Sequence, residues 1–218
     1  MQAGVLNGPE TALIECPEFR QRLLALEASD RVRRDDERDE VLYVLDGSGT
    51  LAVGGEPHPL EPGTGVFVAR GTAWRVEDAH ELRVLSVLVN DPLPATASHA
   101  VIAAGERGTA TAGREFTLLA HPEHGCESVT QFVGHIPPGR APDHYHEYDE
   151  VIYVVEGEGT HWQAGETEHV APGDVVLVPQ GVLHATIPDG PGGMLLYCVF
   201  PVATLDGNVE EVDEPIRL

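Results

Sequence analysis

An internal repeat constrains this chain more than any other feature of its sequence. Residues 11–90 align without gaps on residues 121–200, an offset of 110 positions, and 20 of the aligned positions are identical. Ordinary residue usage would give about five or six identities over such a span. Repeated segments build one structural unit several times, so the sequence predicts two copies of one module. The identical positions, each with the same residue 110 positions later, are Cys16, Gln21, Glu37, Asp39, Glu40, Val41, Tyr43, Val44, Gly47, Gly49, Thr50, Gly55, Glu56, Pro62, Gly63, Val66, Val68, Gly71, Leu85 and Val89.

Both copies have the sequence pattern of a β-protein. Short β-branched runs such as "VIYVV" and "MLLYCVF" alternate with Gly- and Pro-containing turns such as "VAPGD". Strands separated by such turns every ~8–12 residues are typical of antiparallel sandwiches and barrels. We therefore predict an all-β fold with an N-terminal module over 1–100 and a C-terminal module over 101–218. The join is expected around 91–115, where Pro, Ala, Gly and Thr dominate and part of the chain can form an exchanged strand.

One segment has a composition that conflicts with its place in the repeat. Residues 18–29, "EFRQRLLALEAS", resemble a helix, but they align with "SVTQFVGHIPPG", whose valines, phenylalanine and Pro-Pro pair favour a strand. The repeat therefore predicts a strand over 20–26. The tail over 203–218 has little apolar surface to bury, and we expect it to be loose or to lie on the surface.

Charge and cysteine content restrict the partners and the compartment. Thirteen basic and 36 acidic residues give a net charge of −23, which repels nucleic acid and anionic membranes. The cysteines, Cys16, Cys126 and Cys198, form no CxxC pair and are odd in number, which favours a reducing cytoplasm. No export signal or apolar run of ~18 residues is visible. We expect a cytoplasmic protein with a small-molecule substrate, no nucleic-acid or membrane partner, and possible homodimer formation through sheet edges.

The segment "DHYHEYDEVIYVVEGEG" carries a candidate metal site. Alternate residues of a strand face the same side, so His144 and His146 can bind one ion together. Glu150, which begins the next apolar run, can bring a carboxylate oxygen to the same point. A fourth ligand must come from elsewhere in the chain, and the candidate is His184 in "PGDVVLVPQGVLHA".

These residues resemble the two motifs of the cupin family, in the form of a bicupin with two small β-barrels of the jelly-roll or double-stranded β-helix type. The trailing asparagine of the second motif is absent, and Pro188 stands in its place. The spacing from Gly139 to His144 is one residue shorter than usual. By this resemblance the metal ligands are His144, His146, Glu150 and His184. The matching positions are Gly139, His144, His146, Glu150 and Gly157 for the first motif, and Gly173, Pro179, Gly181 and His184 for the second.

The N-terminal copy has lost this ligand set. At the offset of 110 its ligand positions are Arg34, Asp36, Glu40 and Trp74. A guanidinium group repels a metal ion and cannot be deprotonated to bind one. We therefore expect a barrel without metal, in which Trp74 fills the cavity and Arg34 pairs with Asp36 or Glu40 near the vacated site. A small-anion site at Arg34 is the alternative.

The donor set restricts the metal but leaves several reactions open. Three imidazole nitrogens and a carboxylate suit one divalent transition metal, with Fe, Mn, Ni or Zn as candidates, and do not favour Ca or Mg. The cupin resemblance implies a small oxygen-containing substrate and, as the leading hypothesis, a dioxygenase in which Glu150 can also be the catalytic group that removes a proton. A non-redox isomerase or lyase and a non-catalytic binding or sensing protein are the alternatives.

Several neighbouring residues are expected to be structural. Gln131 and Tyr153 recur as Gln21 and Tyr43 in the copy without a metal site, and Cys126 recurs as Cys16. Residues required for both copies serve the shared fold more readily than chemistry in one of them. Strand parity directs Tyr145 away from the two histidine ligands.

Overall fold

The computed structural model describes residues 10–105, 108–109, 113–139, 143–204 and 209–211. Strands dominate these residues; a short 3-10 helix, η2 (Pro122–His124), lies between two of them, and the described part contains no α-helix. The predicted all-β fold is confirmed. Within the same residues, no helix has the length and apolar character needed to cross a membrane.

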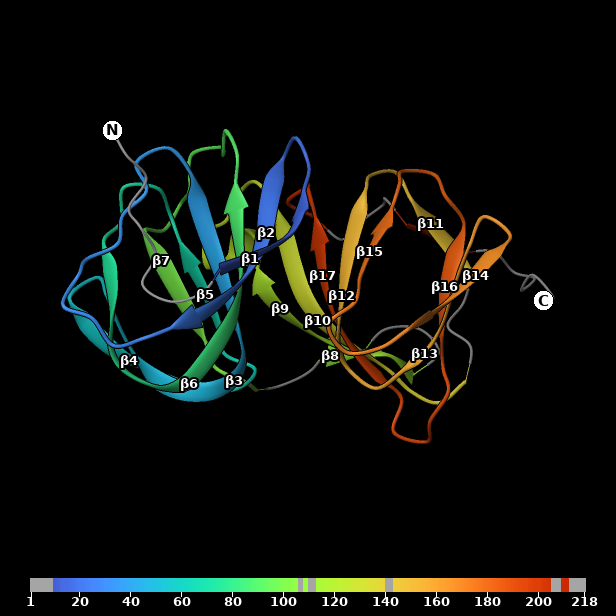
Figure 1. Ribbon diagram of the computed structural model, residues 1–218. Helices are drawn as coiled ribbons and strands as arrows, with labels where there is room; N and C mark the ends of the chain where they lie inside the picture. The colour runs from blue at the N-terminus through green and yellow to red at the C-terminus, as the bar shows by residue number, and fades with distance from the viewer. Residues whose placement is uncertain (1–9, 106–107, 110–112, 140–142, 205–208, 212–218) are drawn as a thin grey trace. The chain divides into compact units, whose positions relative to one another are not determined.

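The N-terminal module is one antiparallel sheet wrapped around its own core. Its strands follow the order β1-β2-β6-β3-β5-β7, and β4 pairs with β3 (Figure 1). The long strands β3 and β6 pair along most of their length, with register shifts that let them bend. The strands are β1 (Glu10–Glu15), β2 (Phe19–Leu26), β3 (Asp39–Val53), β4 (Glu56–Leu60), β5 (Gly65–Val68), β6 (Trp74–Val89) and β7 (His99–Ile102).

The C-terminal module has a corresponding set of strands, but they form two sheets. One sheet has the order β15-β12-β17-β10-β9-β8 and the other has the order β14-β13-β16-β11-β18. The strands are β8 (Gly108–Thr109), β9 (Glu115–Ala120), β10 (Thr130–Ile136), β11 (His144–His146), β12 (Glu150–Glu156), β13 (Gly159–Gln163), β14 (Glu166–Val170), β15 (Val175–Val178), β16 (His184–Pro188), β17 (Met194–Phe200) and β18 (Val209–Glu211).

The offset of 110 relates the strands of the two modules. β3 corresponds to β12 and β13 together, and β6 corresponds to β16 and β17 together. The interruption between β16 and β17 is "DGPGG", where the first module has "AHELR". Pro191 cannot donate to a ladder and the glycines favour a turn, so the second module breaks a strand that the first module continues.

The repeat also decided the ambiguous segment correctly. β2 covers the predicted strand 20–26 and pairs with β6 along its whole length. Its inward positions Leu24 and Leu26 belong to the core of the first module, with Leu42, Val44 and Val84. The second core contains Ile152, Val154, Val178 and Leu196.

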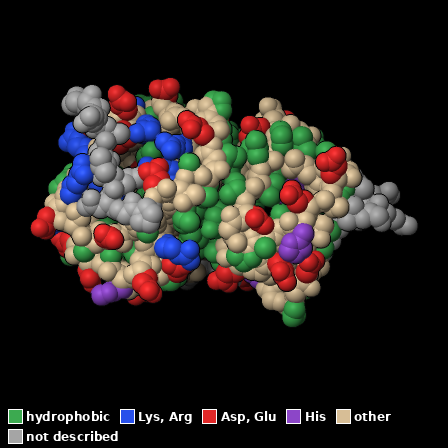
Figure 2. All heavy atoms as spheres, viewed as in Figure 1, with side chains coloured by type: hydrophobic (Ala, Val, Ile, Leu, Met, Phe, Trp, Pro, Cys, Tyr) green, Lys and Arg blue, Asp and Glu red, His purple; other side chains and the backbone are tan. Residues whose placement is uncertain are grey.

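The surface charge is unequally divided between the modules. Figure 2 shows acidic side chains on both modules, whereas the basic side chains on this face gather on the N-terminal one. The sequence agrees, because all 13 basic residues are arginines and nine of them precede residue 100. The carboxylates of the C-terminal module therefore have few basic side chains in their own module to pair with.

Two parts of the chain differ from a simple tandem arrangement. One compact unit combines Met1–Gly105 with Leu119–Val129, and the other combines Glu106–Leu118 with Thr130–Leu218, so the connecting segment contributes to both units. The boundary between 1–100 and 101–218 stays a prediction. The sequence predicts a tail that is loose or lies on the surface, and within it β18 pairs with β11; the remainder of 205–218 lies outside the described residues.

Candidate metal centre

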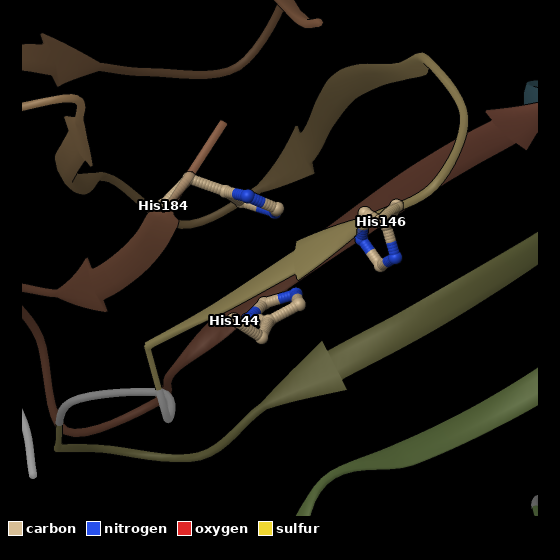
Figure 3. Close-up of side chains that lie close together, drawn as sticks. All are labelled: His144, His146 and His184. Carbon is tan, nitrogen blue, oxygen red and sulfur yellow. The ribbon is translucent and has the colours of Figure 1, made fainter. Parts of the chain in front are cut away.

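Three imidazoles meet where β11 and β16 pair inside the C-terminal module. His144 and His184 are direct antiparallel partners, and His146 lies two residues along on the same face of β11. One ring nitrogen from each histidine lies within 4.8 Å of the other two (Figure 3). The sequence predicts His184 beside the HxH pair across a gap of nearly forty residues, and the strand pairing produces that contact.

Glu150 brings a carboxylate oxygen to the same cluster from the start of β12. Its Oε2 lies 3.1 Å from Nε2 of His146 and 3.3 Å from Nε2 of His184. Ligand atoms held about 2.0–2.2 Å from one ion are roughly 3 Å apart when adjacent. The three histidines therefore fit a transition metal ion by geometry and donor type, and the Glu150 carboxylate lies at ligand-like distance from two of them.

Neighbouring groups fix the orientation of two of the imidazoles. Nδ1 of His184 lies 3.1 Å from the carbonyl oxygen of Val182. With Nδ1 donating to that carbonyl, a deprotonated Nε2 can bind an ion, which is the usual arrangement behind a metal-binding histidine. Tyr148 stacks on His146, with ring centroids 5.3 Å apart, and Phe200 packs against both rings.

Burial and hydrogen bonding act in opposite directions on Glu150. Burial alone raises the pKa of its carboxyl group, but hydrogen bonds and charge interactions with His146 and His184 outweigh that effect and place the pKa well below its ordinary value. Glu150 is therefore an anion at neutral pH. Burial and this nearby carboxylate raise the pKa of the Cys198 thiol well above its usual range, so the cysteine stays a neutral thiol.

A second polar group lines the interior beside the histidines. His161 on β13 is buried; its Nδ1 lies 3.1 Å from Oγ1 of Thr186 and its Nε2 lies 3.3 Å from Oε1 of Gln163. Its ring centroid is 6.0 Å from that of His184. Burial lowers the pKa of His161, so its imidazole is neutral at neutral pH.

In the N-terminal module, the guanidinium group of Arg22 lies beside the glutamate that corresponds to Glu150. Glu40, the counterpart of Glu150, accepts a hydrogen bond of 2.9 Å from Nη2 of Arg22 and one of 2.6 Å from the Ser86 hydroxyl. Trp74 is buried in the core. Arg34 pairs with Asp36 across 2.6 Å, but both side chains are exposed. The predicted Arg34–Asp36 ion pair is confirmed, and that Trp74 fills the vacated cavity stays a prediction.

Several other side chains lie where the repeat predicts them. Gln131 is buried and accepts a hydrogen bond from the Tyr197 hydroxyl, Tyr153 is buried, and Cys126 is buried and free. Their positions suit structural roles.

Two polar clusters are not assigned by the sequence alone. The first cluster is His161, Gln163 and Thr186 in the C-terminal module, and the second is Arg22 and Ser86 in the N-terminal module. His161 is close in sequence to the site, and the other four residues belong to no motif. A usable signal exists in the repeat: at inward-facing positions, one copy is polar where the other is apolar. The exchanged pairs are Leu51 and His161, Val53 and Gln163, Val76 and Thr186, Arg22 and Phe132, and Ser86 and Leu196.

Comparisons with known proteins give one family and several relatives. The family model described as "Cupin domain" matches residues 24–88 and 132–200. A gentisate 1,2-dioxygenase from Ralstonia sp. is 31% identical over 119 residues, covering 47% of this chain and 34% of that protein. The chain thus spans about a third of the length of this curated relative.

Solved structures with a similar fold are more distant in sequence. A protein of Pseudomonas aeruginosa described as glyoxylate-induced superposes with a TM-score of 0.74 at 17% identity, covering 96% of this chain and 82% of the other. A variant of salicylate 1,2-dioxygenase from Pseudoaminobacter salicylatoxidans superposes with a TM-score of 0.72 at 12% identity, covering 91% and 76%. At these identities the likeness concerns the fold.

Proposed function

The chain belongs to the cupin family, and within that family we propose that its C-terminal module is the centre of a metal-dependent dioxygenase that acts on a small oxygen-containing substrate. The observation that carries the proposal is the convergence of three imidazoles, with an anionic carboxylate beside two of them. An ion bound there by His144, His146, Glu150 and His184 would supply Lewis-acid and, if it is iron or manganese, redox chemistry.

The polar interior beside the histidines favours catalysis over a structural metal. A structural site needs only its ligands, and the N-terminal module folds around an apolar interior at the matching positions Leu51, Val53 and Val76. Buried polar groups are costly to place in a core unless they serve a purpose. His161, Gln163 and Thr186 can receive a polar substrate next to His184.

The relatives suggest which substrates to test first. Gentisate and salicylate are aromatic acids with a hydroxyl group beside the carboxylate, and two such oxygens can bind one ion together. We propose an aromatic hydroxycarboxylate as the first substrate class. Glu150 is assigned mainly as a ligand, because a carboxylate with a low pKa is a weak base for removing a proton from the substrate.

Metal analysis combined with oxygen consumption tests this function. Protein purified without chelators is expected to contain about one equivalent of iron or manganese, and to consume oxygen when gentisate or salicylate is added. Zinc or nickel with no oxygen consumption would favour a non-redox isomerase or lyase. Ligand binding by protein that takes up none of Fe, Mn, Ni or Zn would favour a binding or sensing protein.

The ligand assignment is tested by one substitution in each module. We expect His146→Ala to lose most of its bound metal with the barrel still folded, because a buried ligand is removed while the strand pairing remains. The matched control is Asp36→Ala, which changes the same repeat position in the first module and should leave metal content unchanged. Equal metal content in the two variants would refute the assignment.

A further inference from the structure

Gln163 lies beside His184, one of the proposed ligands of the C-terminal centre. It is the antiparallel partner of His184 in the pairing of β13 with β16, so the two side chains stand side by side on the same face. Side chains paired in this way have Cβ atoms about 4.5–5.5 Å apart, which brings a long amide within reach of a molecule bound against the histidines.

A hydrogen-bonded chain holds the Gln163 amide in one orientation. Oε1 of Gln163 accepts from Nε2 of His161, and the other ring nitrogen of His161 is bonded to the Thr186 hydroxyl. A neutral imidazole has one donor and one acceptor nitrogen, so a donor at Nε2 requires Nδ1 to accept from the hydroxyl. With Oε1 engaged, the amide nitrogen has no hydrogen-bond partner among the described residues and keeps its donors for another molecule.

The first module shows that the fold does not need this chain of side chains. At the same inward positions it has Leu51, Val53 and Val76, all buried in its core. Replacing three apolar side chains with hydrogen-bonding ones gives up apolar burial and adds polar groups that must be satisfied. The polar side chains occur in the module that contains the three histidines, so we connect them with the chemistry of that centre.

We propose that the Gln163 amide nitrogen donates a hydrogen bond to an oxygen of the substrate, and that His161 and Thr186 are positioning residues that hold the amide. The inference rests on the proposed function, and it adds a requirement to the substrate class. The substrate must present an acceptor oxygen toward β13, as a carboxylate or a deprotonated hydroxyl does. Substrates that offer only a donor at that point are disfavoured.

Calorimetric titration of the metal-loaded protein with salicylate or gentisate tests the assignment. Gln163→Glu keeps the size and the acceptor but removes both donors, and it should weaken binding roughly 10- to 100-fold, the range expected for a lost hydrogen bond to a charged group. Gln163→Val, which installs the residue of the first module, should weaken it similarly. Metal content and thermal unfolding are measured on the same samples.

Control variants separate the proposed contact from charge and packing effects. Gln180→Glu introduces the same charge at an exposed position outside the cluster and should bind like the wild type. Thr186→Val should weaken binding and Thr186→Ser should restore it, because serine keeps the hydroxyl that His161 requires. A purely structural role for this threonine would not predict rescue of binding by the smaller hydroxyl residue.

Each outcome bears on a different statement. Undiminished binding by Gln163→Glu, or loss of metal from it, would overturn the role of Gln163. Failure of both anions to bind the metal-loaded wild type would overturn the substrate class. Anion binding that depends on Gln163 without oxygen consumption would contradict the proposed dioxygenase and support the Gln163 contact.

Discussion

Glutamate occupies equivalent buried positions in the two modules, as Glu40 and Glu150, and both need a positive or hydrogen-bonding partner. A buried carboxylate without one carries a large desolvation cost. Glu150 lies against His146 and His184, whereas Glu40 lies against Arg22 and Ser86. The guanidinium of Arg22 thus supplies in the first module the cation that we propose a metal supplies in the second.

Removing Arg22 should therefore be costly. We expect Arg22→Leu to lower the free energy of unfolding by about 3–5 kcal/mol, the cost typical of breaking a buried pair and leaving one charge uncompensated. Replacing both partners, as Arg22→Leu with Glu40→Leu, should restore much of that loss because no charge then remains buried. Urea denaturation of the wild type and the two variants measures the difference.

An exposed ion pair gives the comparison. Arg83 forms a bidentate pair with Asp46, but both side chains are exposed, so Arg83→Leu should change stability by only about 0–1 kcal/mol. Equal losses for the Arg22 and Arg83 variants would contradict the view that Arg22 compensates a buried charge.

Asp39 gives the molecule a pH-dependent contribution of known sign. Burial raises the pKa of its carboxyl group above the ordinary value of 3.8, although a hydrogen bond from the backbone N–H of Arg70 partly opposes this. The folded protein therefore holds this proton more tightly than the unfolded chain does. The contribution to stability is complete below about 3.8 and is lost as the pH rises through the raised pKa.

Asp39→Asn removes the ionisation and keeps an oxygen that can accept from Arg70. We expect the variant to be more stable than the wild type at pH 7, and this advantage to disappear as the pH falls toward 3.8. Thermal unfolding between about pH 3.5 and 7 measures it. A gain that is constant over this range, or a loss at neutral pH, would show that ionisation of Asp39 is not the cause.

At the scale of elements, the repeat is a better guide than local composition. The segment containing "RQRLLALEA" has helix-forming residues, yet it is strand β2, because its partner in the repeat cannot be helical and its inward leucines complete the core. The sequence does not predict β18, since its pairing with β11 is a tertiary contact that the polar tail does not indicate.

The structure explains why one repeated position is glycine in both modules. Gly47 and Gly157 both have φ of +78°; Gly47 lies at a register shift within β3, and Gly157 lies between β12 and β13. A Cβ added to Gly157 would lie 2.4 Å from the carbonyl oxygen of Gly193, which is backbone and cannot move aside cheaply. This close approach explains why the position is glycine in both modules.

Two substitutions can separate backbone strain from steric contact. Gly165 has φ of +91°, but a Cβ added there would project into open space, with nothing within 4 Å. Gly165→Ala should cost about 1 kcal/mol from strain alone, and Gly157→Ala should cost more because the contact is added. Chemical denaturation measures both, and a larger loss for Gly165→Ala would refute the steric explanation.

Across the whole molecule, the convergence of the four proposed ligands could be predicted and their surroundings could not. His144, His146, Glu150 and His184 follow from residue types whose spacing suits a metal. The roles of Gln163 and Arg22 depend on which inward-facing side chains are neighbours on paired strands. These neighbours are known only when the strand register is known. Polar-for-apolar exchanges between repeats are a signal that sequence comparison can use, provided that the inward positions are identified first.

The two modules should respond differently to metal. A ligand that binds only the folded state stabilises it in proportion to the logarithm of its concentration over Kd, about 2.7 kcal/mol at 100 times Kd. We expect chelation to increase amide hydrogen exchange in β11, β12 and β16 and to leave β3 and β6 unchanged. Exchange measured peptide by peptide with and without a chelator tests this, and equal effects in both modules would contradict a single centre.

The same asymmetry predicts that a second centre cannot be made with one substitution. Trp74→His restores one imidazole, but Arg34 and Asp36 still stand at the positions of the HxH pair, and the Arg22 guanidinium still binds Glu40. We expect the variant to bind one metal per chain, as measured by elemental analysis against protein concentration. Two ions per chain would contradict this expectation. That result would mean that a metal ion displaces the Arg22 guanidinium from its hydrogen bonds with Glu40 and Ser86.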